Sequence, residues 1–475
     1  MSLEIKNNHK TAFQQIFNLV AKDNKIDKKG LEELFHTIDY QVTEEQFNEM
    51  VAKIFNKKEQ IGFEEFLKIF NLKLTDYTFN DVSNAFKLLA KDDDKYISLE
   101  KFLISSLQSH QVLHIDLIYN QIGPINASEL GSALANCTNL SNLTLNLRGH
   151  KIGANSASGL ISSLRHCIYL SNLTLNFFGN QIYAIGASDL GHALANCTSL
   201  SNLTLDLGHN RIGAIGASDL GSGLANCINI SNLTLNLYNN KIRDQGTSEL
   251  GFGLANCTNL SNLTLYLCCN KIGDQGTSGL GSGLANCTNL QNLTLNLKNN
   301  QIGDQGISIL GSALANCTNL TNLTLYLGNN KIGDQGTSDL GYALANCTNL
   351  SNLALGLYRN QIGATGVSGL GLALANCTNL SNLKLDVARN QIGASGLGTA
   401  LANYINLSNL KLYLCYNQIG PISASELGSA LANCTNLSNL KLNLRENQIN
   451  GSQKLKVKSK CHKSKRLVVF KIYFW

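Results

Sequence analysis

Leucines alternate with other residues in a motif that recurs along most of the chain. The motif reads Leu-x-Leu-x-Leu-x-x-Asn-x-Ile-Gly, and its first copy begins near residue 112. The alternation predicts a short strand with one buried face, because successive side chains of a strand point to opposite sides. We count twelve such strands, which begin at Leu113, Leu143, Leu173, Leu203, Leu233, Leu263, Leu293, Leu323, Leu353, Leu383, Leu410 and Leu440.

The remainder of each unit predicts a turn and a short helix. After the strand that begins at Leu263, Asn270 can satisfy backbone groups where the chain turns. Gly273 and Gly276 are expected to permit that turn. Leu280 and Leu284 stand four residues apart, on one side of a helix. One unit cannot cover its own leucines, so we expect neighbouring units to stack.

Cysteines recur at one position of the unit and form a predicted column. Ten share it: Cys137, Cys167, Cys197, Cys227, Cys257, Cys287, Cys317, Cys347, Cys377 and Cys434, while Tyr404 replaces cysteine in one short unit. We interpret them as small buried residues in a reducing compartment. Asn-Leu-Thr triplets such as the one at Asn142 would place glycans beside predicted strands if the chain were secreted. No signal peptide begins the chain, so we predict a cytoplasmic protein.

These motifs resemble a known repeat family. The leucine pattern, with Ile-Gly-Asp-Gln-Gly at Ile272–Gly276, Ile302–Gly306 and Ile332–Gly336, resembles the ribonuclease-inhibitor type of leucine-rich repeat, which NOD-like receptors and Ran GTPase-activating proteins also contain. The resemblance covers residues 111–450 and implies an α/β horseshoe solenoid, with parallel strands inside and helices outside. The repeats are slightly longer than is usual in that family. Because they are rich in asparagine and nearly identical to one another, they resemble the repeats of ciliate proteins.

Two distant copies of the repeat are almost identical. The segment Ile122–Leu143 differs little from Ile419–Leu440. Copies this close within one chain indicate recent duplication and predict that single repeats are partly interchangeable.

Residues 1–110 have a different character. They are charged, and Phe13, Ile16, Phe17 and Val20 have helical spacing. Three helix-loop-helix units are predicted, and the third, at residues 85–103, resembles the EF-hands of calmodulin. The second is EF-hand-like at residues 61–70. The resemblance implies a small all-α domain before the solenoid.

The EF-hand-like loops lack the residues that hold calcium tightly. A working loop needs a carboxylate at its first position and a glutamate at its twelfth. The third loop has Ala90 and Lys101 there, which leaves Asp92, Asp94 and Ser98 as weak calcium candidates. The second loop is one residue short. We therefore expect no cofactor and no bound metal, with calcium as the weaker alternative.

Charge and motif content exclude several classes of function. The formal net charge is +6, but residues 451–475 contain eight Lys or Arg and no acidic residue, so the excess belongs to this tail and does not predict nucleic-acid binding. No phosphate-binding loop, His-Glu-x-x-His or zinc-spaced cysteine pair appears, so no enzyme is expected. The tail is expected to cap the last repeat, or to contact an anionic membrane surface through residues 454–475.

Residues between and just after the strand leucines vary while the core positions barely change. These positions should face the concave surface, and Tyr and Arg are typical of protein interfaces. The predicted partner-binding residues are Tyr238, Tyr266, Tyr326, Tyr358, Arg359, Lys384, Arg389, Lys411, Tyr413, Lys441 and Arg445, and Arg148 lies at an equivalent position. The alternative is an ordinary solvated face.

These residues predict a cytosolic scaffold that binds a protein partner on its concave face. The lysines on the last three of the twelve strands form a column, which favours an acidic partner. Two alternatives remain: a calcium-responsive adaptor gated by residues 1–110, and a GTPase-activating protein by analogy with Ran GTPase-activating proteins.

Overall fold

The computed structural model describes residues 21, 25–37, 51, 60–61, 111–116, 124–393, 398, 401, 404, 406–462 and 466–474. The calcium candidates Asp92, Asp94 and Ser98 lie outside these residues, as do Ala90 and Lys101. Within the first 110 positions, the described elements are helix α2 (Lys28–Thr37) and strands β1 (Ile26–Asp27) and β2 (Gln60–Ile61), which pair antiparallel.

A single parallel sheet runs the length of the repeats. Its thirteen strands follow each other in sequence order and pair in register, residue to equivalent residue. They are β3 (Val112–Asp116), β4 (Asn142–Asn146), β5 (Asn172–Asn176), β6 (Asn202–Asp206), β7 (Asn232–Asn236), β8 (Asn262–Tyr266), β9 (Asn292–Asn296), β10 (Asn322–Tyr326), β11 (Asn352–Gly356), β12 (Asn382–Asp386), β13 (Asn409–Tyr413), β14 (Asn439–Asn443) and β15 (Val469–Tyr473). The twelve predicted strands are thus confirmed, and the tail adds β15.

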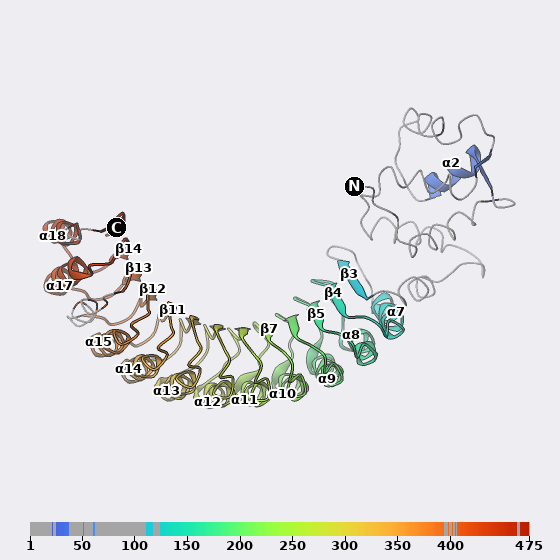
Figure 1. Ribbon diagram of the computed structural model, residues 1–475, viewed down its shortest axis with the longest axis horizontal. Helices are drawn as coiled ribbons and strands as arrows, with labels where there is room; N and C mark the ends of the chain where they lie inside the picture. The colour runs from blue at the N-terminus through green and yellow to red at the C-terminus, as the bar shows by residue number, and fades with distance from the viewer. Residues whose placement is uncertain are drawn as a thin grey trace.

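Helices form the outer layer of the arc, and the strands line its inside (Figure 1). Their bounds are α7 (Pro124–Ala135), α8 (Ala154–Ser162) with the 3-10 turn η1 (Ser163–His166), α9 (Tyr183–Leu194), α10 (Gly213–Leu224), α11 (Arg243–Leu254), α12 (Asp274–Leu284), α13 (Asp304–Leu314), α14 (Asp334–Leu344), α15 (Ala364–Leu374), α17 (Pro421–Asn433) and α18 (Gly451–Cys461). This arrangement is a leucine-rich-repeat solenoid, as the sequence predicts.

The core is continuous from repeat to repeat. Leu263 and Leu265 of β8, Ile272 of the turn, and Leu280 and Leu284 of α12 are each at most 1% exposed. Burial of one leucine side chain contributes roughly 1.5–3 kcal/mol. Because each repeat covers the leucines of its neighbours, only the stack obtains this stabilisation.

A column of asparagines joins each turn to the adjacent repeats. The Oδ1 atom of Asn270 accepts the backbone N–H of Asn240 at 2.8 Å. Its Nδ2 donates to the carbonyls of Leu237 at 2.8 Å and Leu267 at 3.1 Å. The predicted role of this asparagine, satisfaction of backbone groups at the turn, is therefore confirmed.

The cysteine column is buried, as predicted. The thiols contact the helix ends of the preceding repeat. Cys287 Sγ, for example, donates to the carbonyl of Leu254, the last residue of α11, at 3.4 Å. Burial raises the pKa of the Cys257 thiol to about 11 and that of Cys287 to about 12. Tyr404 takes the same place in the short repeat, where its hydroxyl donates to the carbonyl of Gly371 at 2.9 Å.

An aspartate of one repeat caps the N-terminus of the helix in the following repeat. Asp244 Oδ1 accepts the N–H groups of Gly273 at 2.6 Å and Gly276 at 3.0 Å, in the first turn of α12. A carboxylate there satisfies free helix donors and interacts favourably with the helix dipole. The predicted reason for these glycines is wrong. Gly273 has a φ of −105° that any residue adopts, and a Cβ on Gly276 would lie 2.6 Å from the Asp244 carboxylate.

Three repeats that follow an alanine start their helices differently. Tyr183, Gly213 and Arg243 have φ of 55°, 71° and 58°, in the left-handed region. Their N–H groups donate to the asparagine column instead, as Gly213 does to the carbonyl of Asn240 at 2.9 Å. The preceding repeats carry Ala154, Ala184 and Ala214 where Asp244 stands. Among the described repeats, the left-handed start occurs only where the preceding repeat lacks this aspartate, although Gly420 follows Ala394 and still has an extended φ of −88°.

The tail continues the solenoid. Asn450 caps α18 through a reciprocal pair with Gln453, in which each side chain accepts the other residue's backbone N–H. Val457 and Cys461 of α18 are buried. Strand β15 then pairs in parallel with β14 and covers the edge that β14 would otherwise expose.

Candidate protein-interaction face

The third residue of each strand forms a column on the concave face. In β4–β10 this residue is threonine, from Thr144 to Thr324. Ala354 of β11 interrupts the column, which then continues as Lys384, Lys411, Lys441 and Lys471. Register pairing places the lysines on adjacent strands, β12 to β15. The face thus changes from neutral to basic within one column.

The first strand residues form a ladder that is already satisfied. Asn232 Nδ2 donates to Asn202 Oδ1 at 2.6 Å, and Asn352 Nδ2 donates in the same way to Asn322 Oδ1 at 2.6 Å. The side-chain amides of these asparagines are therefore already hydrogen-bonded to one another within the sheet. The columns farther along the strands are the remaining candidates for contact with a partner.

Two tyrosines and a lysine form a compact group at the centre of the arc. Lys298 Nζ lies 4.5 Å from the ring centroid of Tyr326 and 5.5 Å from that of Tyr358. Gly328 and Gly356 make room for the rings: a Cβ on Gly328 would lie 2.2 Å from the Tyr358 ring. Cation–π contacts of this kind orient a charged side chain beside a flat apolar surface.

A second group lies on the last strands. Lys441 Nζ lies 5.3 Å from the ring of Tyr413 and 5.7 Å from that of Tyr473, one on each neighbouring strand. The Arg445 guanidinium lies 5.2 Å from the Tyr473 ring. Lys441 is therefore held between two aromatic rings in register with the other lysines.

The N-terminal part of the face has its own chain of contacts. The Arg148 guanidinium lies 4.7 Å from the Phe178 ring. Edge-to-face contacts continue from Phe178 to His209 at 5.2 Å and from His209 to Tyr238 at 4.6 Å. His209, one position later in its own repeat, thus packs between Phe178 and Tyr238, which occupy equivalent positions in the repeats on either side.

Left-handed residues form a row beside these groups. Gly149 and Gly179 hold the position in the first repeats, with φ of 75° and 71°. Later repeats place side chains there, including Arg359, Arg389 and Tyr416, at φ of 52° to 56°. A side chain in this conformation costs about 1–2 kcal/mol relative to glycine. Glycine fits the fold at this position, so the backbone does not require the large side chains of Arg359, Arg389 and Tyr416.

The Cys268 thiol beside this row is not activated. Cys268 and Cys269 follow β8 and are half-buried. Burial, followed by the neighbouring Cys269, raises the pKa of the Cys268 thiol to about 11. The thiolate is the nucleophilic form of cysteine, so this position favours an unreactive side chain.

The structure places the predicted residues in several groups. Tyr326 and Tyr358 share Lys298, and Tyr413, Lys441 and Arg445 meet around Tyr473. Arg389 lies 4.2 Å from the ring of Tyr416. Tyr238 belongs to the N-terminal chain, and Tyr266 is 36% exposed on β8. Six residues of these groups and of the lysine column were missed: Phe178, His209, Lys298, Tyr416, Lys471 and Tyr473.

The signals for the missed residues were present in the sequence. Lys298 and Tyr416 occupy the same variable positions as the predicted residues. Lys471 and Tyr473 alternate with Phe470 and Ile472, a strand pattern hidden in a tail without repeat motifs.

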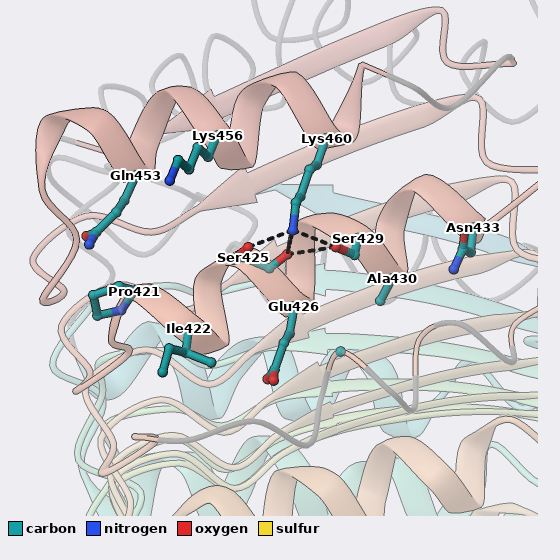
Figure 2. Close-up of a pocket in the computed structure, with 11 residues that line it drawn as sticks. Pro421, Ile422, Ser425, Glu426, Ser429, Ala430, Asn433, Gln453, Lys456 and Lys460 are labelled. Atoms are coloured by element: carbon teal, nitrogen blue, oxygen red, sulfur yellow. Dashed lines mark hydrogen bonds between the residues drawn. The ribbon is translucent and has the colours of Figure 1, made fainter.

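Two hollows accompany the sheet and its helices. A depression of about 500 Å³ lies on the concave face around Ala354, with Thr324 on one side and Lys384 and Lys411 on the other. A pocket of about 550 Å³ lies between α17 and α18, with Gly398 also in its lining (Figure 2).

The pocket between the last helices is a packing seam with its lysine already engaged. Lys460 Nζ donates to the Ser425 carbonyl at 3.2 Å, to Ser425 Oγ at 2.6 Å and to Ser429 Oγ at 2.8 Å (Figure 2). This contact fastens α18 to α17. The concave face is therefore the stronger candidate for a binding surface.

The described ranges contain neither a metal-binding cluster nor a helix that could span a membrane. No group of three His, Cys, Asp or Glu side chains in them could hold a metal ion. None of the helices described there is long and apolar enough to cross a membrane.

Comparison with known proteins supports the repeat assignment. The "Leucine Rich repeat" family matches residues 199–221, 289–311 and 379–399. Among curated proteins, none matches. The chain therefore contains leucine-rich repeats that match this family over these three segments.

Two solved structures illustrate the likeness. The leucine-rich-repeat protein of Leptospira interrogans has 16% identity and a TM-score of 0.39, over 81% of this chain and 100% of that one. The leucine-rich-repeat ectodomain of a plant membrane receptor kinase from Arabidopsis thaliana, in complex with Casparian strip integrity factor 2, has 18% identity and a TM-score of 0.28, over 74% of this chain and 48% of that one.

Proposed function

We propose that this protein is a non-enzymatic cytosolic scaffold that binds a protein partner on the concave face of its solenoid. The observation that carries the proposal is the row of left-handed positions. The first repeats show that glycine fits there, while Arg359, Arg389 and Tyr416 keep large side chains at an energetic cost. Tyrosine and arginine groups beside that row supply the residue types that anchor protein interfaces.

The test uses substitutions that the chain itself already contains. Tyr266, Tyr326 and Tyr413 end their strands at a position where Asn236 and Asn296 stand in other repeats. The variant Tyr266→Asn/Tyr326→Asn/Tyr413→Asn should therefore fold. Affinity capture from native cytosol with the full chain should retain a partner that this variant loses. Equal capture by both, with equal unfolding midpoints, would refute the concave-face proposal.

The partner surface is expected to be acidic at the C-terminal end of the arc. Lys384, Lys411 and Lys471 are exposed there, and Asp386 is the only acidic residue among the described residues of strands β12 to β15. Opposite charge on a partner would speed encounter and fix its orientation. Capture that is insensitive to salt would argue against this charge complementarity.

A calcium-responsive adaptor is the second candidate. Ile26 and Ile61 pair across β1 and β2, which joins the first two predicted helix-loop-helix units. Asp27 Oδ1 accepts the N–H of Gly30 at 2.7 Å at the start of α2. A calcium titration of the full chain, followed by circular dichroism and partner capture, decides this candidate. No calcium-dependent change in either signal would remove it.

The GTPase-activating alternative and the membrane contact each need one assay. Arg148, Arg389 and Arg445 lie over aromatic rings, which suits an anchoring role. A GTP hydrolysis assay with candidate GTPases would revive the catalytic alternative if rates rose. Vesicle co-sedimentation that depends on residues 454–475 would support membrane contact, and binding that survives their deletion would exclude it.

A further inference from the structure

The lysine column has four rungs, because the tail supplies the last one. Pairing of β14 with β15 sets Lys441 beside Lys471, after Lys384 and Lys411 on β12 and β13. Lys384, Lys411 and Lys471 are exposed. The sequence pattern ended the column at Lys441, so the fourth rung is a finding of the structure.

The surroundings of the column hold these charges in place. Tyr413 and Tyr473 flank Lys441 at 5.3 Å and 5.7 Å. Asp386 is the one carboxylate on these strands, and it accepts the N–H of Ala388 at 3.2 Å. Burial raises the pKa of Asp386, and Lys384 lowers it in part. The column therefore retains a positive excess along its whole length.

We infer that this column binds an acidic α-helix that crosses the strands and carries one carboxylate per turn. Adjacent strands are about 4.8 Å apart, which sets the spacing of the lysines. Carboxylates on one face of a helix recur every turn, about 5.4 Å. Those on one face of an extended segment recur every second residue, about 6.7 Å.

The spacing decides between the two shapes of partner. Over the three steps from Lys384 to Lys471, a helix drifts from the rungs by about 2 Å in total. An extended segment drifts by about 6 Å, more than the distance between two rungs. Flexible lysine side chains can absorb the first difference but would be shifted by a full rung in the second.

The depression beside the column adds one further feature to the partner. Ala354 precedes Lys384 by one strand and replaces the threonine of the earlier strands. The hollow of about 500 Å³ over Ala354 can accept an apolar side chain. The helix is thus expected to place one apolar residue a turn before its carboxylates. This inference rests on the proposed concave-face function and specifies its partner.

The test compares two peptides of one composition. One carries a leucine and then a glutamate at each of four successive helical turns; the other carries the same residues with the glutamates at every second position. Fluorescence anisotropy would measure binding of each to the full chain. We expect the helical pattern to bind about tenfold more tightly. Equal affinities would overturn the inference.

The chain offers a matched control. Lys384→Thr/Lys411→Thr/Lys441→Thr/Lys471→Thr restores the residue of the earlier strands, so the variant should fold, as its unfolding midpoint would verify. It should lose about tenfold in affinity for the helical peptide. Retained affinity would overturn the inference, and so would tighter binding of a single-stranded RNA of equal charge.

A reverse substitution and the tyrosine variant complete the design. We call the variant without the four column lysines the lysine-free variant. Binding of the helical peptide should return when this variant also carries Thr234→Lys/Thr264→Lys/Thr294→Lys/Thr324→Lys. Failure to restore it would contradict the spacing argument. If the lysine-free variant keeps a captured partner that the tyrosine variant loses, the inference falls while the proposed function stands.

Discussion

Replacement of a single aspartate should change the backbone of the following repeat. Asp274 Oδ1 accepts the N–H groups of Gly303 at 2.6 Å and Gly306 at 3.0 Å, at the start of α13. In Asp274→Ala these two donors lose their acceptor. Gly213, which follows a repeat with Ala184 at this position, has the left-handed conformation. We expect Gly303 to adopt the same conformation and to donate its N–H to the asparagine column instead.

The magnitude follows from what is lost and what is regained. Removal of a helix cap by alanine costs about 0.5–2 kcal/mol, and hydrogen bonds to a charged acceptor contribute roughly 1.5–3 kcal/mol each. The alternative start recovers one backbone hydrogen bond, about 0.5–1.5 kcal/mol, and glycine tolerates the new conformation. The net loss of unfolding free energy for Asp274→Ala should be about 1–2 kcal/mol.

A double-mutant cycle tests the conformational part of this reasoning. Alanine at Gly303 is compatible with the extended φ, with a small shift of the Asp274 carboxylate because its Cβ would lie 3.1 Å from Oδ2, but in the left-handed start it would cost about 1–2 kcal/mol. The double change Asp274→Ala/Gly303→Ala should therefore destabilise the chain by more than the sum of its single changes. Urea unfolding followed by circular dichroism gives the free energies, and hydrogen exchange of α13 locates the change.

The outcome that would refute the reasoning is additivity within error, or an Asp274→Ala variant as stable as the parent. Asp339 provides the control, because it is half-buried on α14 and accepts the Gln335 amide of the same helix at 2.8 Å, without a hydrogen bond to the next repeat among those described. Asp339→Ala should change the unfolding free energy by less than about 0.5 kcal/mol.

Three further predictions concern the buried columns. Cys268, Cys269 and Cys415 are half-buried and the other eleven thiols are buried, so a thiol reagent should label these three first and the rest only on unfolding; early labelling of Cys287 would contradict this. Burial raises the thiol pKa from 9.0 to about 12 at Cys287, so only the unfolded state releases its proton between pH 9 and pH 11. Stability should then fall by about 1.4 kcal/mol per pH unit for each such thiol, and a flat alkaline profile would disprove it. Tyr404→Phe should cost about 0.5–1.5 kcal/mol by thermal unfolding, because the Gly371 carbonyl loses the Tyr404 hydroxyl and keeps only the Ala375 N–H; an unchanged midpoint would count against that bond.

The fold could be predicted from the sequence because the same pattern of apolar positions recurs in every repeat. The period-two leucines of β8 and the four-residue spacing of Leu280 and Leu284 specify a buried strand face and a helix face, and stacking follows from the exposed remainder. Asn270 has one geometry that satisfies its amide, which made its role predictable. The tail strand escaped because Phe470 and Ile472 alternate only once, outside the motif.

The candidate site was accessible only in part. Column membership predicted which residues share the concave face, since register follows from the repeat length. Side-chain groupings such as Lys298 with Tyr326 and Tyr358 depend on where glycine leaves space, at Gly328 and Gly356. The purpose of Gly276 was likewise hidden, because its constraint comes from Asp244 in another repeat.

The aspartate that caps a neighbouring helix changes what counts as a heritable module in this chain. A repeat that carries Asp274 requires a successor with glycine at positions such as Gly303 and Gly306, whereas a repeat that carries Ala214 is compatible with Arg243. Duplication or deletion of one repeat would separate such pairs at its boundary. Gene rearrangements should therefore be tolerated best when their breakpoints keep each aspartate with the helix start that it caps, so that the inherited unit spans the junction between repeats.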